Sequence, residues 1–281
     1  MRKIGFIDYF LDEYHAHNAF KTVALANEKL GYDYKIVGAY AERDSDGGLT
    51  TDEFCAKYGI ARYNTIEELA KDVDALMIFA PDNAERKEAL AFEAIPFGKP
   101  IFMDKTFTSS YASAVRIFSE ADKYGTPLFS SSSLRYSSEL APFKGDSTSV
   151  LVFGSGVTME DYAVHYLEIV ISLMGVGVKR VAFEQRGIQE WVDLTYADGR
   201  RATMAISMES YLDFHVFLAD RNGSTADITV KSNFFALQME EILKFFSGAE
   251  PSFDRNETLE LMRVYDAIFE VKENSNKCVT L

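Results

Sequence analysis

The chain has 281 residues, of which 47% are hydrophobic and 26% are charged, a balance typical of a globular protein. Its net charge of −14 repels a phosphate backbone and argues against nucleic acid as a partner. The two cysteines, Cys55 and Cys278, stand far apart in the sequence, which argues against a disulfide framework or a zinc site.

The first segment, Lys3–Asp8, is a short apolar run that predicts a strand and not a secretory leader. No segment approaches the roughly 20 apolar residues that cross a bilayer. The sequence therefore predicts a cytoplasmic protein without a membrane partner.

Strands and helices alternate over about the first 130 residues. The predicted strands are Lys3–Asp8, Tyr34–Ala41, Asp74–Ala80, Pro100–Asp104 and Pro127–Ser131, and the predicted helices are His15–Leu30, Thr51–Tyr58, Ile66–Lys71, Asn83–Phe97 and Ser109–Tyr124. This alternation predicts an α/β fold, a Rossmann-type doubly wound parallel sheet with helices on both faces. Ligands of such sheets bind beyond the carboxyl ends of the strands.

The pattern changes after Leu134, where serine-rich segments predict a domain boundary. We expect a dinucleotide-binding-like domain over 1–133 and a substrate or oligomerisation domain over 134–281. The second domain is predicted to contain a helix at Met159–Met174, strands at Val178–Phe183, Gln189–Tyr196, Ala202–Ser210, Phe214–Ala219 and Ala226–Val230, helices at Phe234–Phe246 and Asn256–Glu273, and a closing strand Cys278–Leu281. Turn signals between the strands predict hairpins, and hence an α+β domain with a mainly antiparallel open sheet.

Several segments of the first domain carry a family resemblance. The segment from Ile36 to Arg135 resembles the N-terminal domain of the Gfo/Idh/MocA oxidoreductases, and the features that match in and around it are YKIVGAYAERD, KYGIARYNTIEEL, DVDALMIFAPDN, FGKPIFMDKTF and SLRY. DYAVHYLEIVISLMG and ETLELMRVYDAIFEV resemble the second domain of that family more loosely. The resemblance implies hydride transfer between NAD or NADP and a sugar, polyol or sugar acid.

The resemblance implies that Lys105 is catalytic. It stands in Asp104-Lys105-Thr106, where the family usually has Glu-Lys-Pro. A lysine beside a nicotinamide could take the hydroxyl proton or polarise the forming carbonyl. From the residues alone, an exposed loop lysine paired with Asp104 is the alternative.

Asp161 and His165 stand four residues apart and share a predicted helix face. The resemblance implies that His165, with Asp161, acts on the substrate carbinol as acid, base or orienting group, which suits a side chain with an ordinary pKa of about 6.5. Tyr162 flanks the pair as a candidate substrate-binding residue. The alternative is a structural Asp–His pair, and Glu168, one turn further on, reads as a solvated or capping acid.

Arg135 and Tyr136 stand at the predicted domain junction as candidate substrate-binding residues. Arg135 suits a substrate carboxylate or a cofactor phosphate, or else a contact that holds the domains together. His215 lies in an alternating strand and is predicted to be structural.

The glycine-rich turn of a Rossmann site is replaced in this chain. Its three glycines let the backbone approach a pyrophosphate at a helix N-terminus, but here the matching positions hold Asp8, Phe10 and Glu13. Phe10 would obstruct that approach, and the acids would repel phosphate. Two hypotheses stay open: an NAD(P)-dependent dehydrogenase, or a family member that has lost dinucleotide binding and is a non-redox enzyme or a sugar-type ligand-binding or regulatory protein.

The cofactor contacts that the resemblance implies are Asp8, Phe10, Leu11, Glu42, Arg43, Pro81, Asp104 and Lys105. Glu42 would accept from a ribose hydroxyl, and Arg43 would stack on adenine or meet a 2′-phosphate, unless both belong to a plain solvated loop. Carboxylates and imidazoles in DYFLDEYHAH are metal-ligand types, but a helix cap by Asp12 explains the acids more simply, and no metal is predicted.

Large apolar residues at Trp191–Tyr196 and Met204–Met208 predict an exposed patch on the second sheet. We therefore expect a homo-oligomer, either a twofold-symmetric dimer or a tetramer, which acts on a small sugar-like substrate.

Overall fold

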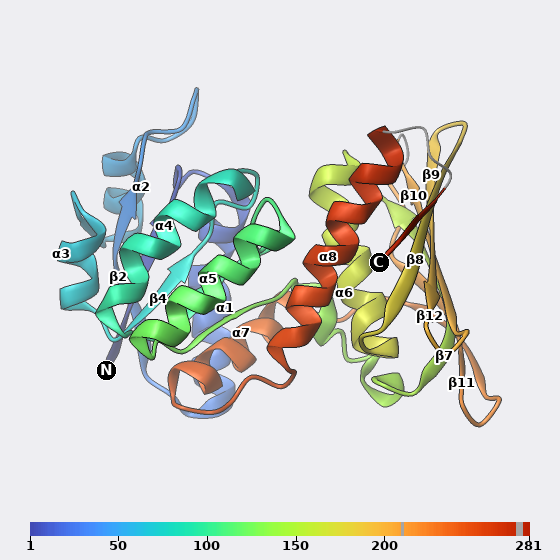
Figure 1. Cartoon of the computed structure of the whole chain (residues 1–281). Coiled ribbons are helices and arrows are strands. Elements are labelled where there is room, and N and C mark those ends of the chain that lie inside the picture. Colours follow the sequence, from blue (N-terminus) through green and yellow to red (C-terminus); the bar gives the residue numbers. More distant parts are fainter. Residues whose placement is uncertain (209–210, 274–277) are drawn as a thin grey trace. The chain divides into compact units, whose positions relative to one another are not determined.

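The computed structural model describes residues 1–208, 211–273 and 278–281, which divide into two compact units (Figure 1). Unit 1 comprises Met1–Ser131 and Phe235–Ser252, and unit 2 comprises Ser132–Phe234 and Phe253–Leu281. The first break thus falls after Ser131, where we had expected it after residue 133. The segment Phe235–Ser252, which the sequence had placed in the second domain, packs in unit 1.

The described part of unit 1 holds a six-stranded parallel sheet in the order β3-β2-β1-β4-β5-β6. Its strands are β1 (Arg2–Asp8), β2 (Tyr34–Ala41), β3 (Ala61–Arg62), β4 (Ala75–Ile78), β5 (Ile101–Met103) and β6 (Leu128–Ser130). This order is the predicted doubly wound Rossmann topology. The edge strand β3 was not predicted, because two residues are too short to show a period.

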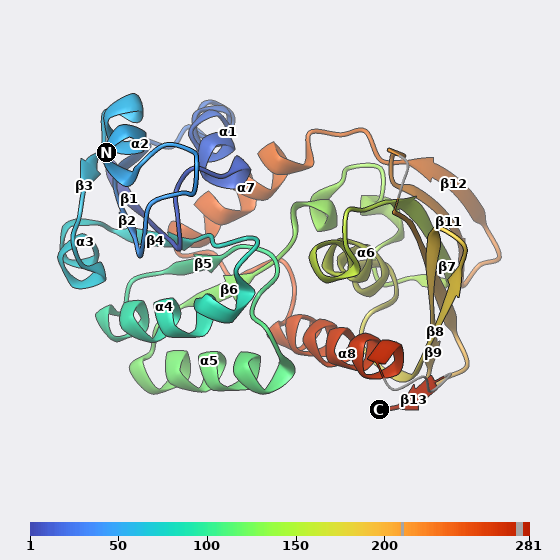
Figure 2. The same ribbon diagram turned by 90° about the horizontal axis from the view of Figure 1, so that it is seen from above.

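Helices cover both faces of this sheet, as predicted (Figure 2). They are α1 (Tyr14–Leu30), α2 (Thr51–Tyr58), α3 (Ile66–Asp72), α4 (Lys87–Ala94), α5 (Tyr111–Tyr124) and α7 (Phe234–Phe246). The predicted helix Asn83–Phe97 is instead α4 between two 3₁₀ turns, Ala84–Arg86 and Ile95–Phe97. Pro96, in the second turn, has no N–H with which to continue an α-helix.

The described part of unit 2 holds a seven-stranded sheet in the order β12-β11-β7-β10-β9-β8-β13. Its strands are β7 (Ser147–Ser155), β8 (Val178–Arg186), β9 (Gln189–Tyr196), β10 (Arg201–Ser207), β11 (His215–Asp220), β12 (Thr225–Thr229) and β13 (Cys278–Thr280). The pair of β7 and β10 is parallel and the other pairs are antiparallel, which confirms the mainly antiparallel sheet.

Two differences from the predicted strands concern β7 and β10. The sequence did not predict β7, because its serines and threonine made the segment look like part of the polar boundary. The strand predicted over Ala202–Ser210 is observed as β10, and residues 209–210 lie outside the described part of the chain.

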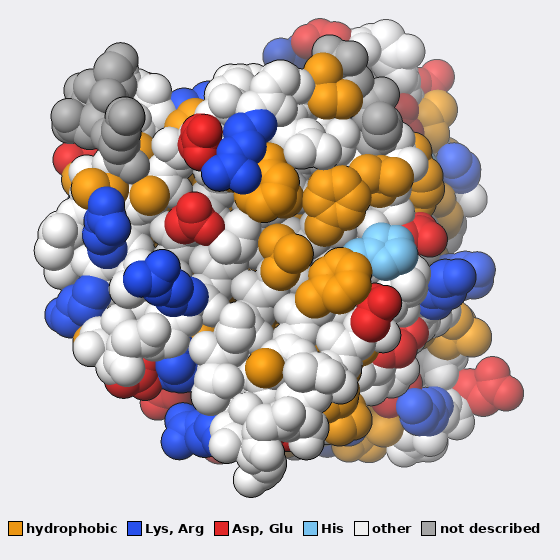
Figure 3. Space-filling view, turned by 90° about the vertical axis from the view of Figure 1, so that its right-hand side faces the viewer, with side chains coloured by type: hydrophobic (Ala, Val, Ile, Leu, Met, Phe, Trp, Pro, Cys, Tyr) orange, Lys and Arg blue, Asp and Glu red, His pale blue; other side chains and the backbone are white. Residues whose placement is uncertain are grey.

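Helices α6 (Met159–Met174) and α8 (Arg255–Glu273) cover one face of the second sheet, and the other face is open (Figures 1 and 2). Hydrophobic side chains gather on the open face (Figure 3). Among the described helices, none is both long and apolar enough to span a bilayer.

Candidate active site

The carboxyl ends of β1 and β4 meet through Asp8. This side chain is only 1% exposed, and its Oδ1 accepts hydrogen bonds from the N–H groups of Tyr9 (2.7 Å) and Ala80 (2.9 Å). Ala80 adopts φ 49°, a left-handed conformation that is strained for a residue with a side chain. Asp8 therefore holds the backbone in place where β4 ends.

Glu13 caps helix α1. Its Oε2 accepts from the N–H of His15 (2.5 Å), and its Oε1 accepts from the N–H of Ala16. We had expected Asp12 to be the cap. Asp12 instead accepts from the N–H of Leu49 (2.8 Å) and lies 2.7 Å from His17 Nε2, so it fixes the loop that precedes α2.

Lys87, which the sequence analysis missed, holds the chain just after β5. Its side chain is fully buried, and its Nζ donates to the carbonyl oxygens of Asp104 (2.7 Å), Lys105 (2.7 Å) and Thr106 (2.9 Å). A signal for it existed: Lys87 occupies a helical position on the buried face that Leu90, Ala91 and Ala94 share. The backbone that carries Lys105 is therefore fixed from within the core.

Lys105 and Asp104 have different partners. Asp104 Oδ2 lies 2.8 Å from His15 Nδ1, while Lys105 Nζ lies 3.8 Å from Oδ1 of the exposed Asp82. The Lys105 side chain is only 8% exposed, so it is not the exposed loop lysine of the alternative hypothesis. Among the described residues, His15 Nε2 makes no hydrogen bond, and the His15 side chain keeps 15% of its surface exposed.

The buried carboxyl groups cannot all be ionised. Burial raises the pKa of Asp8 to about 8 against the hydrogen bonds that lower it, and burial followed by the charges of Asp8 and Asp104 raises the pKa of Glu13 to about 9. Burial would also raise the pKa of Asp104, but His15, Lys87 and Lys105 outweigh it and hold that pKa below its usual value. Asp104 is thus the anion at pH 7, while Asp8 and Glu13 retain protons.

These residues do not fit a dinucleotide in the usual Rossmann position. The pyrophosphate of such a ligand lies on the N-terminus of the helix after β1. In this chain Glu13 already takes the N–H groups of His15 and Ala16 there, and two further carboxyl groups, Asp8 and Asp104, are buried beside it. A pyrophosphate would have to enter this acidic, buried group of side chains.

Glu42 and Arg43, the residues expected to bind adenosine, have other partners within the protein. Arg86 donates two hydrogen bonds to Glu42, from Nε to Oε2 (2.9 Å) and from Nη2 to Oε1 (2.5 Å). Arg43 pairs with Asp46. The guanidinium groups of Arg43 and Arg86 lie 5.7 Å and 6.0 Å from the centre of the Tyr9 ring.

The remaining predicted cofactor residues belong to the same unit. Leu11 and Pro81 are buried, and Phe10 is half-buried. Within the described residues, no group of three or more His, Cys, Asp or Glu side chains is placed to hold a metal ion.

In unit 2, the structure gives Asp161 and His165 different hydrogen-bond partners. The Asp161 carboxyl accepts from the Thr158 hydroxyl (2.6 Å) in the first turn of α6, while His165 Nδ1 lies 2.6 Å from Ser132 Oγ. The Tyr162 ring meets the His165 ring edge-on at 5.6 Å. Ser132, which the sequence analysis missed in a serine-rich run, therefore fixes the orientation of His165.

Arg135 is engaged inside unit 2 and is only 3% exposed. Its Nε donates to Glu168 (2.6 Å), its Nη1 donates to Glu257 (2.7 Å), and its guanidinium stacks 3.9 Å from the centre of the Phe253 ring. Glu168 is thus a buried partner of Arg135, not a solvated acid. The contacts of Arg135 join α6 and α8 and leave a substrate carboxylate little access to it.

Tyr136 and His215 are the remaining predicted residues of unit 2. Tyr136 is buried, with Lys144 Nζ 5.5 Å from its ring centre. His215 Nδ1 lies 3.2 Å from the hydroxyl of Thr229 on the neighbouring strand, which agrees with the predicted structural role.

Comparison with known proteins identifies the fold. No family model and no curated protein sequence matches the chain. Solved structures do match: GenD2 from gentamicin A biosynthesis in complex with NAD is 13% identical, with a TM-score of 0.79 over 100% of this chain and 97% of that one. An oxidoreductase from Agrobacterium radiobacter in complex with NAD⁺, L-tartaric acid and magnesium is 14% identical, with a TM-score of 0.74 over 99% and 98%.

The dehydrogenase MviM from Clostridium difficile is also 14% identical, with a TM-score of 0.74 over 96% of this chain and 99% of that one. Coverage of both units in order confirms the architecture that the sequence motifs predicted. The chain therefore has the two-domain fold of the Gfo/Idh/MocA-type dehydrogenases and oxidoreductases.

Proposed function

We propose that this chain is an enzyme of the Gfo/Idh/MocA fold that acts on a small, sugar-like molecule by proton transfer at the carboxyl end of β5, without a dinucleotide on α1. The observation that carries this proposal is the setting of Lys105. Its ammonium group is almost buried, and its ion pair with Asp82 is long, at 3.8 Å. Burial of a weakly paired charge is unfavourable, and such groups are concentrated at functional sites.

The chemistry that suits these groups is removal of a proton beside a carbonyl. His15, held by Asp104, accepts the proton on Nε2, and the electron pair of the broken C–H bond moves onto the carbonyl oxygen. The Lys105 ammonium stabilises the negative oxygen that forms. Return of the proton from His15 to the same carbon gives exchange. Delivery to the former carbonyl carbon gives isomerisation, in which the proton of the neighbouring hydroxyl passes to the oxygen that carries the negative charge, with no net oxidation.

Deuterium exchange tests this proposal. Sugars, sugar acids and their keto forms are incubated with the protein in ²H₂O, and loss of the proton beside the carbonyl is followed by NMR. We expect His15→Gln and Lys105→Met to slow exchange by about 100-fold or more, and His17→Gln, a neighbour paired with Asp12 and Tyr58, to leave it unchanged. Exchange that is insensitive to both site substitutions contradicts the proposal.

The second candidate is an NAD(P)-dependent oxidoreductase that acts on a sugar, polyol or sugar acid. The likeness to GenD2 and to the Agrobacterium oxidoreductase, both solved with NAD, favours it, as does Lys105 at the strand end where ligands of this fold bind. In that case His165 and Tyr162 are the substrate-side residues. Binding of NADH or NADPH by the purified protein at micromolar concentration would favour this candidate over the first.

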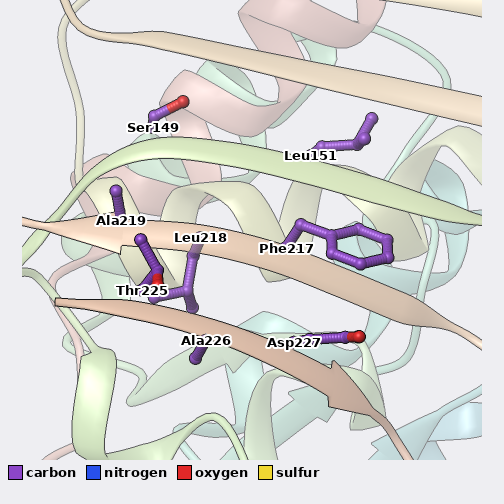
Figure 4. Close-up of a pocket in the computed structure, with 8 residues that line it drawn as sticks. All are labelled: Ser149, Leu151, Phe217, Leu218, Ala219, Thr225, Ala226 and Asp227. Atoms are coloured by element: carbon purple, nitrogen blue, oxygen red, sulfur yellow. The ribbon is translucent and has the colours of Figure 1, made fainter.

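For assembly, we propose a twofold-symmetric dimer through the open face of the second sheet. This face has a groove of about 590 Å³ lined by Ser149, Leu151, Phe217, Leu218, Ala219, Thr225, Ala226 and Asp227 (Figure 4). Phe217 is 43% exposed. Of the residues that we expected in the patch, Tyr196 and Met204 are buried, so the apolar surface is centred on β7 and β11 instead.

A further inference from the structure

We infer that the chain's own side chains take the place of the dinucleotide: the Glu13 carboxyl replaces the pyrophosphate, and a group formed by Tyr9, Glu42, Arg43 and Arg86 replaces the adenosine. This inference concerns α1 and the loops around it. It does not depend on proton transfer at β5.

Glu13 lies at the N-terminus of α1, where a Rossmann domain binds the pyrophosphate. A phosphate at a helix N-terminus places its oxygens on neighbouring backbone N–H groups. Glu13 does this with two carboxyl oxygens, which accept from the successive N–H groups of His15 and Ala16. Both donors are therefore satisfied within the protein, and an external anion must displace Glu13 before it can bind.

The carboxyl groups around Glu13 are buried in the protein interior and do not line an open ligand-binding site. Asp8 is 1% exposed, and its Oδ2 has no hydrogen-bond partner among the described residues. Asp104 is buried as well and is held as an anion by His15, Lys87 and Lys105. A doubly charged pyrophosphate would have to displace these buried side chains and give up its own water, and burial of a charged group is unfavourable.

Hydrogen bonds join the three loops among which adenosine would bind. The N–H groups of Glu42 and Arg43 donate to the carbonyl oxygens of Asp8 (3.2 Å) and Tyr9 (3.0 Å), which joins the loop after β2 to the loop after β1. Arg86, in the turn after β4, holds Glu42 with two hydrogen bonds. In a dinucleotide-bound Rossmann domain the ligand lies among these loops.

The packing of residues 44–50 leaves little room for rearrangement. Asp12 accepts from the N–H of Leu49, and a Cβ atom placed on Gly48 would collide with the Asp12 carboxyl. The loop after β2 is thus packed directly against the loop after β1. Opening an adenosine site here requires these hydrogen bonds and the pair of Arg86 with Glu42 to break together.

Titration with inorganic pyrophosphate and with NADH tests the inference. Calorimetry at pH 7 compares the wild type, Glu13→Gly and Asp8→Asn/Glu13→Gly. Asn at position 8 keeps the acceptor for the N–H groups of Tyr9 and Ala80. We expect the wild type to bind neither ligand at millimolar concentration, and the double variant to bind pyrophosphate at least tenfold more tightly than the wild type, since α1 then offers free N–H groups.

Matched variants separate the role of Glu13 from a change in net charge. Glu67→Gln removes one acid from a side chain on α3 that is 63% exposed, and it is expected to leave pyrophosphate affinity unchanged. Glu13→Gln, which keeps the cap acceptor, is expected to bind no better than the wild type. Circular dichroism checks that each variant is folded.

The inference is overturned if the wild type binds pyrophosphate as tightly as the double variant, or if the folded double variant gains no affinity. These outcomes are independent of proton transfer at β5. Deuterium exchange at β5 could fail while the double variant still gains pyrophosphate, or the reverse.

Discussion

A single buried lysine shows how side chains, and not strand periodicity, shape this site. Lys87 Nζ donates to three consecutive carbonyl groups at 2.7–2.9 Å, and burial lowers its pKa to about 7. The strand that ends at Met103 could be predicted from its apolar run. Lys87, which fixes the turn after this strand, was missed because lysine is mostly exposed, although its helical spacing from Leu90 and Ala94 places it on the buried face.

Replacement of Lys87 tests this structural role. Lys87→Met keeps the length of the side chain but leaves three carbonyl groups without their donor, and each buried unsatisfied group costs about 1–3 kcal/mol. We expect the free energy of unfolding to fall by about 3 kcal/mol or more in urea. Lys123→Met, a change at an exposed lysine paired with Glu120, should shift it by no more than about 0.5 kcal/mol. Equal stability of both variants would contradict the role.

Retention of protons on Asp8 and Glu13 makes stability depend on pH. Because their folded-state pKa values are raised to about 8 and about 9, the folded protein binds more protons than the unfolded chain above about pH 5. Stability must then fall as pH rises. Lys87 acts in the opposite sense, but only above about pH 7, so the effect of the carboxyl groups is clearest between pH 5 and 7.

Urea titrations across that window should show the decline. Each retained proton contributes a slope of up to about 1.4 kcal/mol per pH unit. We expect Glu13→Gln, whose amide does not titrate, to have a shallower slope than the wild type. Parallel curves for the two proteins would show that Glu13 is ionised in the folded state.

At the scale of elements, the sequence predicted the central strands and most helices, because buried parallel strands are continuous apolar runs and amphipathic helices have a clear period. Elements without such signals were missed: the two-residue strand β3, and β7, which begins with serine and threonine. For the side chain of Arg135, too, the sequence could not predict the partners. Its position was predicted to matter, but its partners on α6 and α8 lie 33 and 122 residues away.

Removal of the Arg135 charge tests whether it stabilises unit 2. Arg135→Leu leaves Glu168 and Glu257 without their cation, and breaking a buried pair in this way costs about 3–5 kcal/mol. We expect a clear loss of stability in calorimetric melts. Arg221→Leu, at a 60% exposed arginine that lies 3.7 Å from Asp146, is the control and should melt like the wild type. A normal melt for Arg135→Leu would reopen a role in substrate binding.

At the scale of the whole molecule, the chain leaves unit 1 at Ser131, builds most of unit 2, and returns to unit 1 with Phe235–Ser252. The hydrophobic period alone could predict α7 but not the unit that it joins, because an apolar helix face does not show which surface it packs against. Gln238 on α7 donates to the carbonyl oxygen of Ser131 (2.9 Å), and Phe245 packs against Phe129 at 4.7 Å. These contacts fix α7 in unit 1.

Replacement of Phe217 tests the proposed dimer. Phe217→Asp places a charge in the centre of the apolar groove and, beside Asp227 on the paired strand, adds like-charge repulsion. We expect sedimentation velocity at micromolar concentration to show a dimer for the wild type and a monomer for Phe217→Asp. A wild type that sediments only as a monomer would contradict the proposal.

Calorimetric titration of the wild-type protein with NADH at pH 7 tests the central claim most directly, namely that Glu13 and its neighbours fill the place of the dinucleotide. The account predicts no measurable heat of binding at millimolar NADH. A saturable heat with a micromolar Kd would contradict it.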